Sequence, residues 1–237
     1  MSPPSLRVFS TLALAGVLEE MTPRLADIRL ETILAPTAML LERIRAGETA
    51  DIALLLSDSV DALAQQGILL SGRTDLARSL VGIAVRAGAP HPDISTVAAF
   101  VATMHAAKSL AYSRAGASGL YFAGLLERLH IADAVNAKAT VIPSGFTGEL
   151  VRRGEAEIAV QQISELMVVP GIDIVGTLPP GIEGVSIFSA GIFAASQHAA
   201  LARSAIARLA APDAADVFRA KGLEPLGNPA SRRSQAE

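Results

Sequence analysis

Apolar and polar positions in the first third of the chain switch repeatedly between a strand-like and a helix-like period. The predicted strands are 7–10, 28–34 and 51–56, and the last is a nearly continuous apolar run typical of a buried parallel strand. The predicted helices are 11–26, 38–46 and 57–66. This alternation predicts a parallel sheet with helices packed on its faces.

A second block of the same kind follows. Its predicted strands are 80–86, 109–112, 137–142 and 157–161. Its predicted helices are 96–105, 120–129 and one that opens after Pro143 and ends near Arg153. A Pro/Gly-rich passage over 170–184 then leads to a long apolar run, 185–195, and to two Ala-rich helices, 197–210 and 213–221.

Two α/β blocks in tandem, followed by a long return segment, predict two lobes joined by two crossings. We expect lobe I to contain residues 1–80 and 185–237, and lobe II residues 81–184. Each lobe is expected to be a mostly parallel sheet flanked by helices.

Composition and charge narrow the classes of function. Of the 237 residues 51% are hydrophobic and 18% charged, the net charge is −3, and there is no cysteine. These values predict a sizeable core and no basic face for nucleic acid. They exclude disulfides, thiol catalysis and thiolate metal sites. No apolar run approaches the ~20 residues of a membrane span.

The N-terminus bears on the cellular compartment. The apolar run 8–18 superficially resembles a signal peptide, but it lacks a basic segment before it and a cleavage site after it. We interpret it as a strand entering a helix. A periplasmic location therefore requires that a leader was removed, and the alternative is a cytoplasmic protein.

Hydroxyl residues stand at nearly every strand-to-helix junction, and glycine accompanies them in the second block. The junctions are Ser10-Thr11, Pro36-Thr37-Ala38, Ser57-Asp58, Gly116-Ala117-Ser118-Gly119 and Ser144-Gly145-Phe146-Thr147. Ligands of parallel sheets bind at this edge, where helix N-termini present free N–H groups to anions. Converging ends could therefore bind an oxyanion without Lys or Arg, whereas each hydroxyl alone could be an ordinary helix cap.

Other polar residues give weaker signals. No dinucleotide or P-loop motif occurs, and the four histidines lack metal-ligand spacing, so neither cofactor nor metal is expected. Arg114 lies in the Gly/Ser loop and could reach a carboxylate. Gln161 and Gln162 end a buried strand, where they could line a pocket or point at a hinge between the lobes.

Several segments together resemble the molybdate-binding-protein-like branch of the type II periplasmic binding proteins, over about residues 6–225. The matching segments are Val8-Phe9-Ser10, Gly47-Glu48-x-Ala50-Asp51, Asp75-Leu76-Ala77-Arg78-Ser79, Tyr112-Ser113 with Gly116-Ala117-Ser118-Gly119, Gly154-Glu155-Ala156-Glu157, Gln161-Gln162-Ile163-Ser164-Glu165-Leu166 and Lys221-Gly222-Leu223-Glu224-Pro225.

This resemblance implies a Venus-flytrap fold that holds a small anion between its lobes and delivers it to the membrane component of an ABC transporter. The first-lobe contacts would be Ser10 and Thr37, with Thr11, Ala38 and Ser57 beside them. The second-lobe contacts would be Ala117, Ser118, Gly119, Phe146 and Thr147. A monomer that binds no nucleic acid is expected.

The chain departs from the molybdate binders at Gln162, where the resemblance places their tyrosine. Gln162 is included among the expected ligand contacts, but the ligand could then be an organic carboxylate. Aconitate isomerase resembles this family, which gives a second hypothesis: an isomerase of a small unsaturated polycarboxylate with Glu165 as the first residue to test as a base. A third hypothesis is a cytoplasmic anion-sensing domain.

Overall fold

The computed structural model describes residues 3–227, and the chain divides into two compact units. Unit 1 comprises Met1–Ser79 and Ile187–Glu237, and unit 2 comprises Leu80–Ser186. Two long strands, β4 (Thr74–Arg86) and β9 (Val185–Ile192), have residues in both units. Among the described residues, no helix is long and apolar enough to span a membrane.

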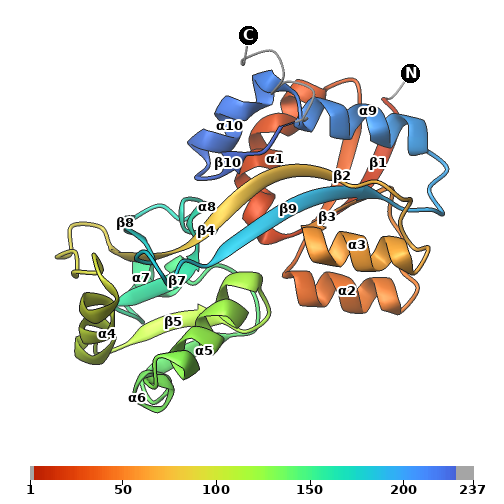
Figure 1. Ribbon diagram of the computed structural model, residues 1–237. Helices are drawn as coiled ribbons and strands as arrows, with labels where there is room; N and C mark the ends of the chain where they lie inside the picture. The colour runs from red at the N-terminus through yellow and green to blue at the C-terminus, as the bar shows by residue number, and fades with distance from the viewer. Residues whose placement is uncertain (1–2, 228–237) are drawn as a thin grey trace, which may run out of the picture. The chain divides into compact units, whose positions relative to one another are not determined.

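The sheet of unit 1 is built around parallel strands (Figure 1). Strands β1 (Ser5–Ser10), β2 (Arg29–Leu34) and β3 (Ile52–Leu56) run parallel in the order β2-β1-β3. Strand β9 pairs antiparallel with β3. The short β10 (Glu224–Pro225) pairs antiparallel with the first part of β4.

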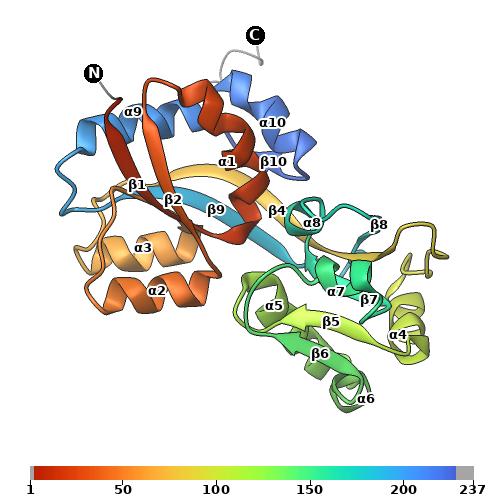
Figure 2. The same cartoon turned by 180° about the vertical axis from the view of Figure 1, so that it is seen from behind.

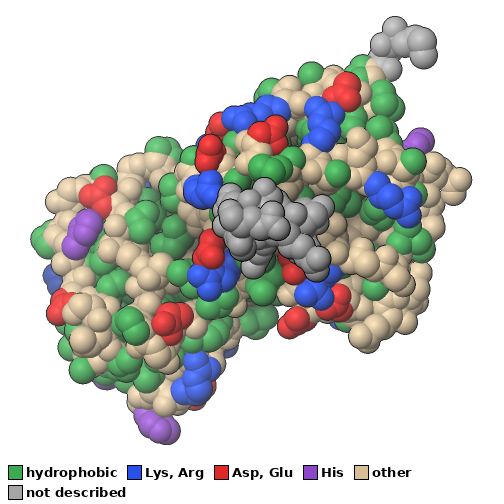
Figure 3. All heavy atoms as spheres, turned by 45° about the horizontal axis from the view of Figure 1, so that its top comes forward, with side chains coloured by type: hydrophobic (Ala, Val, Ile, Leu, Met, Phe, Trp, Pro, Cys, Tyr) green, Lys and Arg blue, Asp and Glu red, His purple; other side chains and the backbone are tan. Residues whose placement is uncertain are grey.

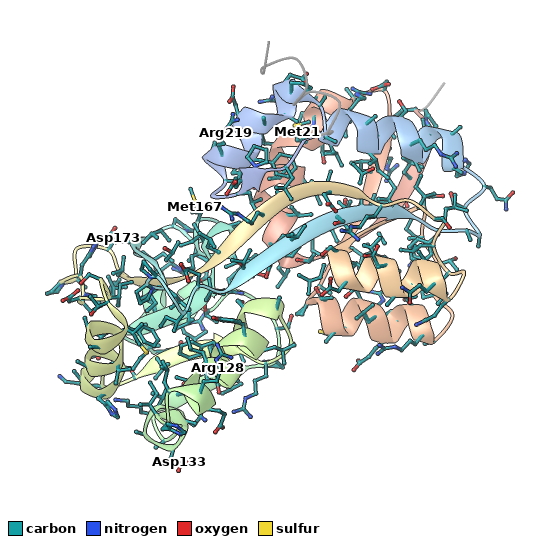
Figure 4. The ribbon with its side chains drawn as sticks, viewed as in Figure 1. Met21, Arg128, Asp133, Met167, Asp173 and Arg219 are labelled. Carbon is teal, nitrogen blue, oxygen red and sulfur yellow. The ribbon has the colours of Figure 1, made fainter. Side chains whose placement is uncertain are left out.

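Alternating side chains of unit 1 fill two cores, one on each face of the sheet. Leu6 and Val8 of β1 pack with helices α1 (Ala15–Met21), α9 (Ala199–Leu209) and α10 (Ala215–Ala220). Phe9 of β1 packs on the other face with α2 (Thr37–Arg45) and α3 (Ser57–Gln65). Figure 2 shows these helices from behind, and Figure 4 labels Met21 of α1, a member of the first core.

The single helix predicted over 11–26 is wrong, because the structure has three short pieces there. They are the 3-10 turn η1 (Leu12–Leu14), α1 and the 3-10 turn η2 (Thr22–Leu25). Pro23 lacks the N–H that would continue the α-helical pattern, and the Thr22 hydroxyl donates to the Leu18 carbonyl at 2.6 Å. The helical spacing of apolar residues is nevertheless present, because all three pieces bury their apolar side chains in the same core.

Unit 2 combines parallel and antiparallel pairs. Strand β5 (Leu110–Ser113) runs parallel to β6 (Ala139–Ile142) and to β7 (Ile158–Gln162). The second part of β4 pairs antiparallel with β7 on one side and with β8 (Ile172–Thr177) on the other. Strand β8 was not predicted, because its sequence lies inside the Pro/Gly-rich passage and its pairing with β4 is long-range.

Helices cover both faces of the unit 2 sheet. Tyr112 packs with α4 (Val97–Ala106), α5 (Ala117–Arg128) and α6 (Ala132–Asn136), whereas Ala111 packs with α7 (Gly148–Arg153) and α8 (Ile163–Leu166). In Figure 4, Asp133 of α6 points away from the sheet, and it is exposed. On the face in Figure 3, acidic and basic side chains lie beside one another instead of forming a patch of one sign.

Glycine is required where α5 begins against β5. A Cβ built on Gly119 would lie 1.2 Å from the Ser113 carbonyl oxygen, so only glycine allows this close approach. On the same helix, a Cβ on Gly124 would meet only the Arg128 side chain, at 3.7 Å.

We therefore expect Gly119→Ala to lower the free energy of unfolding by about 3 kcal/mol, because α5 must move away from β5. Gly124→Ala should instead raise it by up to about 1 kcal/mol, since alanine favours the helix. Urea unfolding measures both. Equal stabilities for the two variants would contradict the close packing.

Candidate functional site

In unit 1 the parallel strands bring the predicted hydroxyl residues to one edge of the sheet. Ser10 lies opposite Leu34 of β2 and Leu54 of β3. The Thr11 N–H donates to the Leu54 carbonyl at 3.0 Å, and the Ala35 N–H donates to the Ser10 carbonyl at 3.1 Å. The chain segments that enter η1, α2 and α3 therefore leave adjacent strand ends.

The hydroxyls at this edge differ in their hydrogen-bond partners within the protein. Thr11 is an ordinary cap, since its Oγ1 accepts the Ala13 N–H at 3.0 Å, and Ser10 Oγ donates to the Thr11 carbonyl at 3.1 Å. Thr37 is the first residue of α2, and Ala38 follows it. Ser57 likewise begins α3, so its predicted role as a cap of that helix is wrong.

The residues before Thr37 and Ser57 have side chains that cannot cap. They are Pro36 and Leu56, and neither makes a side-chain cap. Within residues 3–227 the hydroxyls of Thr37 and Ser57 have no hydrogen-bond partner, although Thr37 is only 8% exposed. Two helix N-termini of unit 1 therefore retain unsatisfied donors.

In unit 2 the carboxyl ends of β5, β6 and β7 lie at one edge, because Ser113 pairs with Ile142 and Ala111 with Ala159. Helix α5 begins there after Gly116, which offers no side-chain cap, with Ala117 and Ser118 in its first turn. Ser118 is 3% exposed, and its hydroxyl, which is not one of the fully buried unpaired oxygens, makes no hydrogen bond within residues 3–227. Its hydroxyl and the first N–H groups of α5 are thus free to bind an anion.

The other predicted hydroxyl of unit 2 is already bound. Gln161 Oε1 accepts the Thr147 N–H at 2.8 Å and the Thr147 hydroxyl at 3.0 Å. Gln161 Nε2 donates to the Gly145 carbonyl at 3.0 Å. The amide therefore fixes the loop that carries Gly145, the half-buried Phe146 and Thr147 to the end of β7. Sequence reasoning missed this role of Gln161.

Gln162 has a different environment. Its Nε2 donates to the Ser186 hydroxyl at 2.8 Å, and the side chain is 1% exposed. The Ser164 hydroxyl has no hydrogen-bond partner in the described part of the chain, and Gln162 Oε1 makes no hydrogen bond of full geometry, although it faces the Glu165 backbone N–H in a capping box at the start of α8. Such buried unpaired atoms cost about 1–3 kcal/mol each, so a ligand or water that satisfies them would bind favourably.

Glu165 completes this polar group at the start of α8. Its carboxylate accepts the Gln162 backbone N–H at 3.3 Å, and the residue is 7% exposed. Burial raises the pKa of the Glu165 carboxyl to about 7, although the Gln162 N–H and the Gln161 amide both favour the ionised form. The carboxyl is therefore partly protonated at neutral pH and can both take up and release a proton.

The arrangement fits anion binding with neutral donors next to one titratable carboxyl. In residues 3–227 no group of three or more His, Cys, Asp or Glu residues is placed to hold a metal ion. Cavities of about 1020 Å³ in unit 1 and about 500 Å³ in unit 2 are lined by none of the predicted site residues.

The raised pKa of Glu165 predicts a pH dependence of stability. The folded chain, with a pKa of about 7 against an ordinary value of 4.5, binds more protons between these pH values. The contribution of Glu165 is fully present below pH 4.5 and is lost as the pH rises through 7. Glu165→Gln stays neutral, so its stability relative to wild type should rise with pH by on the order of 3 kcal/mol.

Urea unfolding at a series of pH values measures this difference. The exposed Glu127, on α5, provides the control, and Glu127→Gln should follow the wild-type profile. If Glu165→Gln also followed that profile, the raised pKa would be wrong.

The two hydroxyls of unit 2 should respond differently to removal. Thr147→Val should lower the free energy of unfolding by about 1 kcal/mol, because Gln161 Oε1 loses a buried donor. Ser118→Ala should change it by less than about 0.5 kcal/mol, since that hydroxyl has no partner to lose. Thermal and urea unfolding measure both, and an equal cost would show that Ser118 is also bound internally.

Comparison with known proteins shows the family and the fold of this chain. A curated relative, an aconitate isomerase from a Pseudomonas species, is 36% identical over 232 residues, which cover 94% of this chain and 88% of the relative. The molybdate-binding protein of Azotobacter vinelandii has a TM-score of 0.74 at 17% identity, covering 92% of this chain and 98% of that one. The sulfate-binding protein of Mycobacterium tuberculosis has a TM-score of 0.73 at 14% identity, covering 98% and 90%.

These structural likenesses confirm the predicted fold, the α/β type II periplasmic-binding-protein fold. A family model described as bacterial extracellular solute-binding protein matches residues 6–224. The chain therefore belongs to the bacterial extracellular solute-binding protein family and is structurally similar to molybdate- and tungstate-binding proteins.

Proposed function

We propose that this protein is an isomerase that shifts a proton and a double bond within a small unsaturated polycarboxylate. The relative that is 36% identical over most of the chain is an aconitate isomerase, which supports this reaction class. The observation that carries the proposal is the buried Glu165, whose pKa of about 7 lies in the range that a general base needs.

The chemistry requires one proton acceptor and a site for negative charge. In a substrate such as aconitate, a CH₂ group lies between a carboxylate and the double bond, so the carbanion left by proton removal is delocalised over both. Return of a proton to the far carbon moves the double bond, and no electrons are gained or lost. One carboxyl that first accepts and then donates the proton is sufficient.

Glu165 fits this exchange. Because its pKa is about 7, both protonation states are populated at neutral pH. The Gln162 N–H holds the carboxylate at the start of α8, which fixes its direction during the reaction. The neighbouring unpaired Gln162 Oε1 and Ser164 hydroxyl offer further polar contacts for a bound acid.

Neutral donors would bind the carboxylates of the substrate. In unit 2 these are the Ser118 hydroxyl and the N–H groups at the start of α5. Thr147 would support the loop beside this site and not bind substrate itself, since its hydroxyl is engaged by Gln161.

A second function is binding without turnover, for delivery to an ABC transporter. The free hydroxyls and uncapped helix starts favour it, because they suit an oxyanion as well as a carboxylate. This function requires a ligand that raises the melting temperature but is recovered unchanged.

Proton NMR of aconitate in D₂O tests the isomerase. Wild type should interconvert the isomers and introduce deuterium at the exchanging carbon, whereas Glu165→Gln should lose about 10²- to 10⁴-fold in kcat while still binding substrate. Glu127→Gln, which changes an exposed residue of α5, should retain wild-type activity.

Two outcomes would contradict the proposal. Full activity of Glu165→Gln would exclude that residue as the base. No exchange in wild type, together with a melting temperature raised by molybdate, tungstate, sulfate or aconitate, would favour the binding function instead.

A further inference from the structure

Arg114 directly follows β5, and its side chain is held in place by the buried Tyr112. Its Nε donates to the Tyr112 hydroxyl at 3.2 Å, and its guanidinium carbon lies 5.8 Å from the centre of the Tyr112 ring. Tyr112 is fully buried, and its own hydroxyl donates to Asn136 Oδ1 of α6 at 2.7 Å. An exposed arginine is therefore oriented by the buried Tyr112 and, through it, by the half-buried Asn136.

The number of protons in this chain of hydrogen bonds determines which donors of Arg114 remain free. The single hydroxyl proton of Tyr112 goes to Asn136, so the oxygen accepts from Arg114. Only the Nε–H of Arg114 is used. Its two terminal nitrogens have no partner among the described residues, and together they form the end-on fork that matches a carboxylate.

Two other arginines of unit 2 are arranged differently, whereas Arg86 and Arg128, like Arg114, have no acidic partner within residues 3–227. Arg152 pairs with Glu149, and Arg153 pairs with Glu155, so their charges are met by carboxylates of the chain. Arg114 has no acidic partner within residues 3–227 and lies in the loop that leads to Ser118 at the start of α5. An oriented guanidinium without a counter-ion, in the loop that precedes α5, fits an anionic group supplied from outside.

We infer that Arg114 binds one carboxylate of the substrate through its two terminal nitrogens, with Tyr112 and Asn136 as positioning residues. This inference rests on the substrate class of the proposed function and makes Arg114 the residue that selects tricarboxylates over dicarboxylates. A site built to bind a charged group rejects an analogue without it, because the guanidinium is left unpaired.

The test uses saturated acids that cannot isomerise, so binding is measured apart from turnover. Isothermal titration calorimetry compares propane-1,2,3-tricarboxylate with two analogues that each lack a different carboxylate, pentanedioate and methylbutanedioate. Arg114→Gln should weaken tricarboxylate binding about 10- to 100-fold, and should leave unchanged the analogue that lacks the carboxylate bound by Arg114.

Further variants separate charge, fork and orientation. Arg114→Lys keeps the charge without the fork and should recover only part of the affinity. Tyr112→Phe removes only the positioning hydroxyl and should give a smaller loss with the same ligand pattern. The matched control is Arg128→Gln on α5, which should bind the acids as wild type does. The Arg128 guanidinium lies 5.3 Å from the centre of the Tyr121 ring.

The outcomes are distinguishable from those of the isomerase test. Arg114-dependent tricarboxylate binding without any proton exchange would support the inference and remove the proposed reaction. Proton exchange with an unchanged KM in Arg114→Gln would do the reverse. Equal losses for all three acids, or no tricarboxylate binding by wild type, would overturn the inference.

Discussion

Parallel pairing of β5 with both β6 and β7 is the constraint on which the candidate site of unit 2 depends. It brings the start of α5, the loop before α7 and the start of α8 to one edge, although about 50 residues of sequence separate the first from the last. Because each strand end then leads into a helix N-terminus, the edge has a surplus of donors. The close contact of Gly119 with the Ser113 carbonyl keeps α5 directly on this edge.

The polar residues of this edge divide into those that build it and those that remain available. Gln161 builds, since both ends of its amide bind the loop that carries Thr147. Gln162 and Ser164 remain available, because each keeps a buried atom without a partner in the described residues, as Ser79 of β4 also does. Native proteins rarely leave buried polar atoms unpaired. The two that adjoin Glu165, whose own pKa is raised by burial, indicate a region kept for function at some cost in stability.

The alternation of periods in the sequence predicted the strand–helix order and the edge where hydroxyls gather, because both depend on local patterns. It could not reveal β8 or the start of β4 at Thr74, which depend on pairing between distant segments. It also could not separate Thr147 from Ser118, since whether a hydroxyl is free depends on a glutamine amide 14 residues further along. Ser57 resembled a helix cap in the sequence, because its role depends on whether the helix begins at Ser57 or one residue later.

An acidic chain that binds a polycarboxylate needs local positive charge or many donors, and the two choices differ in selectivity. Helix N-termini and hydroxyls bind any small oxyanion of suitable size, which is compatible with molybdate- and sulfate-binding relatives sharing this fold. A guanidinium held in one position distinguishes between anions more sharply. Its two terminal nitrogens fit a planar carboxylate, and only a ligand with a carboxylate at that position can bind to them. In the proposed function, Arg114, oriented through Tyr112 by Asn136, would add to a general anion site the element that an enzyme for one acid requires.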